Sequence, residues 1–208
     1  MPEVERTELI EPVTRWVVNE ALRQQQTWRE QGIDLTIAVN IAAHSLRPSS
    51  DLPGIVAELT ETWATGAGSL TLELTEGAMI EAHAPEILER LHKMGQRISI
   101  DDFGTGYSSL AYLQGLPVDE LKIDRSFVTR LSADSDSAVI VRSTIDLAHY
   151  LGLTVVAEGV ENEAAMDLLV EYGCESVQGY LLGRPCPVED LSTWLIESPH
   201  GLQVTAGG

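Results

Sequence analysis

The chain has 208 residues, long enough for a single domain with a sizeable core, and its 44% hydrophobic and 22% charged residues are typical of globular proteins. Its 32 acidic and 13 basic residues give a formal net charge of −19, which repels a phosphate backbone and argues against extended binding of DNA or RNA. No apolar run approaches the roughly 18 residues of a membrane span, and the N-terminus lacks the basic and apolar regions of a signal peptide. We therefore expect no membrane span and a cytoplasmic location.

Helical periodicity alternates along the chain with short runs rich in β-branched residues. The first helix is predicted over residues 8–31, because Val13, Val17 and Ala21 recur at helical spacing and Gly32 stands where a C-cap would. Further helices are predicted at 53–63, 85–94, 107–113, 137–151, 162–172 and 188–197. Strands are predicted at 35–40, 70–75, 98–101, 120–124, 153–160 and 175–180.

This alternation favours an α/β fold with a parallel sheet and right-handed crossovers. A closed TIM barrel needs eight strands and typically about 250 residues, so we expect an incomplete TIM-barrel-like fold of about six parallel strands. The domain is expected over residues 5–197, followed by a disordered tail at 198–208. In such folds the ligand site lies at the carboxyl ends of the strands.

Two adjacent carboxylates stand at the end of the third predicted strand. Ile98 and Ile100 alternate along this strand, Asp101 and Asp102 follow, and a glycine-rich turn comes next. In mid-strand one of the two carboxylates would point into the core, but at a carboxyl end both can turn towards a common site, where a divalent cation offsets their repulsion. In the alternative interpretation Asp101 starts a turn or caps a helix, and Asp102 is solvated.

Polar side chains mark the ends of all six predicted strands. They are Asn40, Glu73, Asp101, Asp102, Lys122, Glu158 and Gln178. Their oxygen atoms suit Mg²⁺ or Mn²⁺, and zinc is disfavoured because no cysteine or histidine is placed to join them. Two cations sharing Asp101 could generate hydroxide for attack on a phosphate, with Lys122 steadying the water or the developing charge. Cys174 and Cys186 have neither metal-site nor redox-motif spacing, so we expect free thiols.

Each of these residues also has a purely structural interpretation. Lys122 and Asp124 are two apart on one predicted strand and would face the same way, so Lys122 could form an interior ion pair with Asp124 or Glu73. Glu158 could cap a helix after the Gly159 turn, and Asn40 could form a turn.

Five stretches together resemble the EAL domain, the bacterial phosphodiesterase domain that linearises cyclic di-GMP to pGpG. They are L-E-L-T-E at 72–76, I-D-D-F-G-T-G-Y-S-S-L at 100–110, L-K-I-D-R-S-F-V at 121–128, V-V-A-E-G-V-E at 155–161 and V-Q-G-Y-L-L-G-R-P at 177–185. The resemblance runs from about Glu5 to Trp194, and the segment from Ile100 to Val128 is specific enough to stand alone.

The resemblance implies a role for each matching residue. One cation would be held by Asn40, Glu73 and Asp101, and a second by Asp101, Asp102 and Glu158. Lys122 would contact the catalytic water, so that Lys122, Glu158 and Asp101 form the catalytic group. Substrate or loop support would come from Glu76, which orders the loop at 103–109, and from Asp124 and Gln178. The resemblance also implies a homodimer and an upstream regulatory or cyclase domain.

The signature after which the family is named does not lie where the family has it. Glu20, Ala21 and Leu22 spell E-A-L, but they fall inside the first predicted helix, whereas the family's signature glutamate lies on an earlier strand. We therefore expect an N-terminally truncated domain without that metal-binding glutamate, with open sheet edges and weaker metal binding. Three hypotheses stay open: a cyclic di-GMP phosphodiesterase, an inactive module that binds cyclic di-GMP or a protein, and a different metal-dependent hydrolase.

Overall fold

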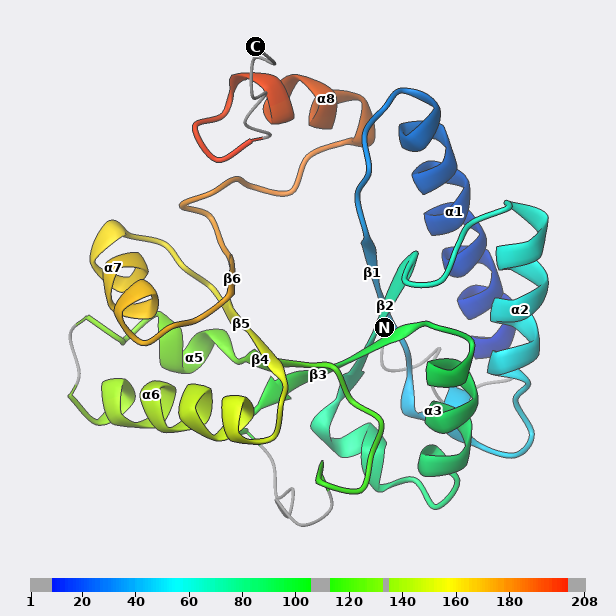
Figure 1. The fold of residues 1–208 in the computed structure, drawn as a ribbon, viewed down its shortest axis with the longest axis horizontal. Helices are drawn as coiled ribbons and strands as arrows, with labels where there is room; N and C mark the ends of the chain where they lie inside the picture. The colour runs from blue at the N-terminus through cyan, green and yellow to red at the C-terminus, as the bar shows by residue number, and fades with distance from the viewer. Residues whose placement is uncertain (1–8, 106–112, 133–134, 202–208) are drawn as a thin grey trace.

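The computed structural model describes residues 9–105, 113–132 and 135–201, and its centre is a curled parallel sheet (Figure 1). The strands follow one another in chain order, and every ladder between neighbours is parallel. They are β1 (Ile37–Asn40), β2 (Leu70–Thr75), β3 (Arg97–Phe103), β4 (Glu120–Ile123), β5 (Thr154–Glu158) and β6 (Ser176–Gln178). The incomplete TIM-barrel-like fold predicted from the sequence is confirmed.

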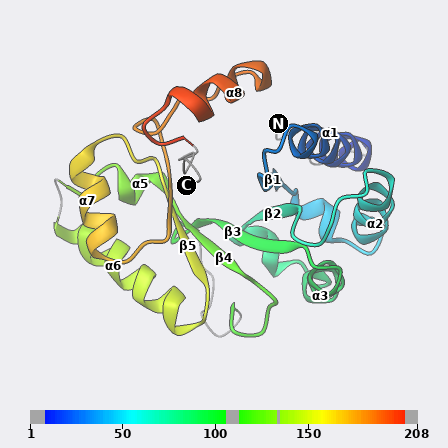
Figure 2. The same cartoon turned by 45° about the horizontal axis from the view of Figure 1, so that its top comes forward.

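The helices lie outside the curled sheet (Figures 1 and 2). They are α1 (Ile10–Glu30), α2 (Leu52–Thr62), α3 (Ala84–Lys93), α5 (Arg125–Val128), α6 (Ser135–Tyr150), α7 (Glu163–Glu171) and α8 (Val188–Glu197), with short 3-10 turns η2 (Ala43–Leu46) and η3 (Glu76–Ile80). The side chains of Asp51 and Asn162 accept hydrogen bonds from backbone N–H groups in the first turns of α2 and α7, which fixes where these helices begin. Gly32 takes a positive φ of 79° just after α1, as a glycine past a helix C-terminus commonly does.

Several predicted boundaries need correction. The third strand runs on past Asp101 to Phe103, and β6 is only three residues long. α5, η2 and η3 were not predicted from the sequence. The predicted helix at 107–113 and the predicted tail fall largely outside the described residues.

The sheet carries apolar side chains on one face and polar side chains on the other. Leu72 and Ile98 are register partners, both fully buried, and lie on the face that packs against the helices. Glu73 and Ser99 are the next pair of register partners and lie on the opposite, concave face. Asp101 follows Ser99 by two residues and shares this concave face, which makes it the place where the strand-end polar residues can meet.

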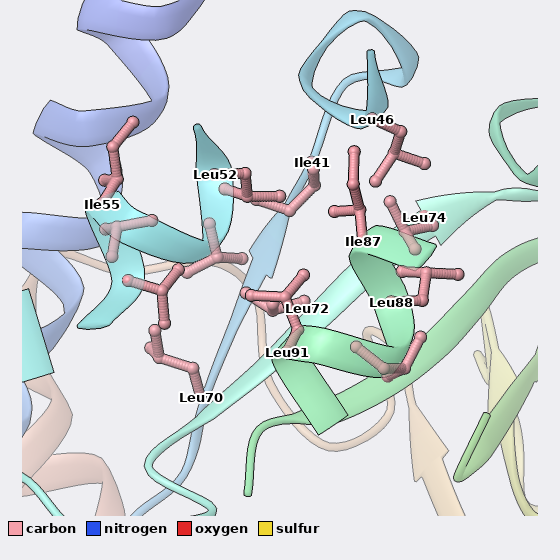
Figure 3. Close-up of a cluster of buried hydrophobic side chains, with 14 of the residues drawn as sticks. Ile41, Leu46, Leu52, Ile55, Leu70, Leu72, Leu74, Ile87, Leu88 and Leu91 are labelled. Atoms are coloured by element: carbon pink, nitrogen blue, oxygen red, sulfur yellow. The ribbon is translucent and has the colours of Figure 1, made fainter. Parts of the chain in front are cut away.

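The buried apolar residues form two clusters that divide at β3. The first packs α1, α2 and α3 against β1 and β2 and includes Ile98. Figure 3 shows part of this cluster, with Leu72, Leu88 and Leu91 among the labelled residues. The second packs α6 and α7 against β4 and β5 and includes Ile100. Leu116 and Val118, in the connection before β4, pack against both clusters.

Within the part of the chain that the structure describes, each outer strand is paired along one edge only. Among the described residues, β1 pairs only with β2 and β6 only with β5. A cavity of 480 Å³ lies beside β1 and is lined by Ile10, Val13 and Val17 of α1, among others. Across the described ranges, every helix is too short or too polar to span a lipid bilayer.

The two cysteines are free, as predicted, but they differ in environment. Cys174 is half-buried, and its Sγ donates to the carbonyls of Val155 and Ser176, 3.6 and 3.2 Å away. Burial raises the pKa of the Cys174 thiol to about 11, and the charge of Glu175 adds to this. Cys186 is exposed.

At pH 8 we therefore expect one thiol per folded chain to react rapidly with Ellman's reagent and the second to react only on unfolding. With a pKa of about 11, only about one Cys174 side chain in a thousand is a thiolate at that pH. Cys186→Ser should remove the rapid phase and leave the slow one. A rapid phase that survives this substitution would contradict the assignment.

Candidate metal centre and active site

Carboxylates from three strands converge on the ammonium group of Lys122. The Lys122 Nζ lies 2.7 Å from Glu73 Oε1 on β2, 3.4 Å from Asp101 Oδ1 on β3 and 2.5 Å from Glu158 Oε1 on β5. Lys122 is 4% exposed and Glu73 7%, so the centre of this cluster is shielded from water. The structure thus brings together four of the residues predicted at the strand ends.

The electrostatics of this cluster are strongly coupled. Burial alone would lower the pKa of Lys122, but hydrogen bonds to Glu158 and Glu73 and the charges of Glu73 and Asp101 outweigh it and raise the pKa well above its ordinary value. Burial raises the pKa of Glu73, and Lys122 does not fully offset this because Asp101 and Glu158 add negative charge. The cluster therefore holds more negative charge than one ammonium group neutralises.

Asp102 reaches this region through an unusual backbone. Its φ is +56°, in the left-handed region that few residues other than glycine adopt, and the ladder between β3 and β4 shifts register between Ile100 and Phe103. These two features break the simple alternation of a strand, which would send Asp101 and Asp102 to opposite faces. Burial raises the pKa of Asp102, and the neighbouring carboxylates of Asp101 and Asp124 add to the effect.

Asp124 does not lie on the fourth strand, as the sequence had suggested. β4 ends at Ile123, and Asp124 is the N-cap of α5, where its Oδ1 accepts a hydrogen bond from the Ser126 backbone N–H at 2.9 Å. Burial opposes its ionisation, but hydrogen bonds from Ser126 and the charge of Arg125 outweigh this and lower the pKa of Asp124. Of the two interior ion pairs considered for Lys122, the one with Glu73 is present.

The remaining predicted residues flank the cluster. Asn40 ends β1 as the register partner of Glu73, and Gln178 ends β6 as the register partner of Glu158. Both side chains are exposed at the edges of the sheet. Glu76, in η3, is buried and accepts a hydrogen bond from the Gly104 backbone N–H at 3.3 Å, at the start of the loop after the Asp pair.

Sequence reasoning missed a second polar layer beneath the cluster. Arg97 Nη2 lies 3.5 Å from Glu120 Oε2 and donates to Thr154 Oγ1 at 3.2 Å. Ser99 is fully buried on the same concave face. The sequence did carry a signal for this layer. Arg97 and Ser99 precede Asp101 at steps of two along β3, and side chains two residues apart on a strand lie on the same face.

The donor set fits hard divalent cations. Among the residues described, no three His, Cys, Asp or Glu side chains stand close enough to surround an ion, since the carboxylates gather round Lys122 instead. The candidate ligands are all oxygen donors, from Asn40, Glu73, Asp101, Asp102 and Glu158, which is the ligand type that Mg²⁺ and Mn²⁺ prefer. Because the negative charge exceeds that of Lys122, bound cations would relieve repulsion that the cluster now carries.

Glu20 lies away from this cluster. It lies in the middle of α1, where its Oε2 is 2.9 Å from Nη2 of Arg23, one helical turn further along, in an ion pair. The tripeptide at 20–22 is therefore part of an outer helix.

Comparisons with known proteins agree with the motifs. The sequence model of the EAL domain family matches residues 1–185 of this chain. The bifunctional diguanylate cyclase/cyclic di-GMP phosphodiesterase MucR of Pseudomonas aeruginosa is 47% identical over 194 residues, covering 92% of this chain and 28% of MucR. Signaling protein YkoW of Bacillus subtilis is 39% identical over 197 residues, covering 94% of this chain and 24% of YkoW. The chain thus spans about a quarter of these relatives.

Solved structures extend the likeness to the fold. The structure of the PaMucR phosphodiesterase in complex with c-di-GMP superposes with a TM-score of 0.86 at 46% identity, covering 91% of this chain and 78% of that one. The EAL domain of Mycobacterium smegmatis DcpA gives a TM-score of 0.83 at 37% identity, covering 89% of this chain and 84% of that one. Because these matches cover most of its length, the chain belongs to the EAL domain family.

Proposed function

We propose that this chain is a cyclic di-GMP phosphodiesterase domain, over residues 5–197, that hydrolyses cyclic di-GMP to linear pGpG with two Mg²⁺ or Mn²⁺ ions. The observation that carries the proposal is the gathering of Glu73, Asp101 and Glu158 round Lys122 at the carboxyl ends of the strands. It is supported by the likeness to MucR, whose solved phosphodiesterase is described as a c-di-GMP complex.

Each residue of the cluster has a task in this proposal. Asn40, Glu73 and Asp101 would hold one cation, and Asp101, Asp102 and Glu158 the other. When bound, the cations would lower the pKa of an attacking water molecule and neutralise charge on the phosphate. Lys122 would exchange part of its carboxylate contacts for hydrogen bonds to that water and to the negative charge that develops.

The residues around the cluster would position the loop and the substrate. Glu76 would hold the loop after the Asp pair through its hydrogen bond with Gly104. Asp124 would keep Asp102 in place from the N-terminus of α5, and Gln178 would face the substrate beside Glu158. The proposal includes a cytoplasmic location, a homodimer and an adjacent regulatory or cyclase domain, the last supported by the share of the relatives that the chain spans.

A second candidate is a module that binds cyclic di-GMP or a protein without hydrolysis. It is favoured by the state of Lys122, whose ammonium group already has three carboxylate partners, and by the edge of β1 beside Asn40, which has no partner strand among the described residues. Binding without turnover would identify it.

The test is turnover of cyclic di-GMP by the purified chain, with pGpG followed by chromatography. We expect product with Mg²⁺ or Mn²⁺, none after treatment with EDTA, and recovery when either cation is restored in excess. Binding of cyclic di-GMP without any product under these conditions would select the second candidate. Turnover that survives EDTA would contradict metal dependence.

A further inference from the structure

Lys122 reaches across a neighbouring strand to one of its carboxylate partners. Lys122 lies on β4 and Glu73 on β2, and β3 lies between these two strands (Figure 1). Neighbouring strands are about 4.8 Å apart, so β2 and β4 are separated by roughly 10 Å. The Lys122 Nζ nevertheless lies 2.7 Å from Glu73 Oε1. The two side chains together therefore span the width of β3 on the concave face of the sheet.

The side chain that β3 places next to this crossing is that of Ser99. Ser99 is the register partner of Glu73 on β2 and of Glu120 on β4. Lys122 follows Glu120 by two residues and so lies on the same face of the sheet. Asp101, which follows Ser99 by two residues, lies 3.4 Å from the Lys122 Nζ through its Oδ1. The bridge from Lys122 to Glu73 therefore crosses β3 beside Ser99.

The hydroxyl group of Ser99 does not explain why a serine stands here. The residue is fully buried, and among the described residues its Oγ has no hydrogen-bond partner. A buried hydroxyl that no protein group uses adds nothing favourable to the fold. The small volume of the side chain is the property that matters, because a larger one would occupy the space that the methylene groups of Lys122 need.

We propose that Ser99 is a positioning residue, whose small side chain leaves the space through which Lys122 reaches Glu73. In this role Ser99 touches neither the substrate nor the reacting atoms, and acts only by setting where the Lys122 ammonium group lies. Protein interiors are packed so closely that a single added methyl group is felt, so even threonine should push the lysine away from Glu73. The consequence for catalysis rests on the proposed function, whereas the effect on the position of Lys122 does not.

Acetylation by an amine reagent, followed by peptide mass spectrometry, tests the position of Lys122 without any turnover. The chain has two lysines, so the exposed Lys93 is an internal reference for Lys122, which is 4% exposed. We expect Lys122 to be protected in the wild type and in Ser99→Ala. Its protection relative to Lys93 should fall about 10-fold in Ser99→Thr and further in Ser99→Val, because the displaced ammonium group loses its contact with Glu73.

The matched control is Ser69→Val. Ser69 is also fully buried, and its Oγ also lacks a partner within the described ranges, but it stands directly before β2, four residues before Glu73. Enlarging it should disturb packing to a similar degree and leave Lys122 protected. Circular dichroism establishes that each variant is folded before it is labelled. If Ser99→Val does not fold, Ser99→Thr makes the same comparison with one added methyl group.

Equal protection of Lys122 in Ser99→Ala and in the larger variants would overturn the proposal. Loss of protection in Ser99→Ala would overturn it by assigning the effect to the hydroxyl, and loss in Ser69→Val would do so by assigning it to general loosening.

Steady-state kinetics with cyclic di-GMP give the functional readout. We expect kcat to fall about 10-fold from Ser99→Ala to Ser99→Thr with little change in KM, because the substrate contacts stay while the ammonium group is misplaced. A change confined to KM would overturn the positioning role. If protection of Lys122 follows the size of residue 99 but the wild type turns over no cyclic di-GMP, the role of Ser99 stands and the proposed hydrolysis falls.

Discussion

Replacing Asp101 by Asn is expected to reduce turnover of cyclic di-GMP by at least about 100-fold, the largest loss of activity for any single substitution in this chain. Asp101 is the residue assigned to both cations, and its Oδ1 also lies 3.4 Å from Lys122 Nζ. The substitution keeps the shape of the side chain but removes its charge, so both cation sites and the contact with Lys122 weaken together. Initial rates at saturating Mn²⁺, followed by chromatography of pGpG, measure the loss.

Glu20→Gln is the matched control for this loss. Glu20 belongs to a tripeptide that spells the family signature, but it lies on α1 in an ion pair with Arg23. We expect wild-type turnover from Glu20→Gln. Near-normal turnover from Asp101→Asn would remove the assignment of Asp101 to the cations, and a large loss from Glu20→Gln would mean that the helix takes part in the reaction.

Lys122→Met is expected to lower the free energy of unfolding by about 3–5 kcal/mol, because it leaves the buried Glu73 and the half-buried Asp101 and Glu158 without a counter-charge. Lys122 is 4% exposed and contacts Glu73, Asp101 and Glu158. Excess Mg²⁺ should recover part of the loss, since a bound cation would supply the missing positive charge. Urea denaturation with EDTA and with Mg²⁺ gives both values.

The control for this substitution is Lys93→Met. Lys93 pairs with Glu89 at 2.9 Å on the exposed surface of α3, where an ion pair contributes at most about 1 kcal/mol.

Because the pKa of Lys122 is raised in the folded state, its contribution is complete below its ordinary pKa and is lost only as the pH rises through the raised value. The titration of Lys122 itself should therefore add no pH dependence to the difference between wild type and Lys122→Met from about pH 6 to pH 9. Equal losses from both lysine substitutions would contradict a central role for Lys122.

The parts of the fold that periodicity controls were predictable. The prediction for β2 matches its bounds at residues 70–75, and α1 begins and ends within two residues of its prediction, because long or strongly patterned segments carry the clearest signal. The four-residue α5 was missed, since four residues are too few to show a helical period. β6 is shorter than predicted because Gly179 packs against the backbone of Val160, where the chain leaves the sheet.

The candidate site was predictable in its members but not in its geometry. The carboxyl ends of parallel strands meet at one edge, and this alone places Glu73, Lys122 and Glu158 near one another. The left-handed backbone of Asp102 and the bulge beside it depend on how β3 packs on β4, and no local pattern indicates them. For the same reason the sequence could not show that Asp124 leaves the strand to cap α5.

Because the apolar core divides at β3, the charged cluster round Lys122 connects the two halves of the molecule. Ile98 belongs to one buried cluster and Ile100 to the other, and among the described residues Leu116 and Val118 pack against both clusters, while Met79 of η3 belongs to the second. Lys122, on β4, reaches back across β3 to Glu73 on β2 and forward to Glu158 on β5. If the proposed cations bind there, their occupancy would bear on whether the two halves unfold as one cooperative unit or as separate ones, and Lys122 would couple ligand binding to folding cooperativity.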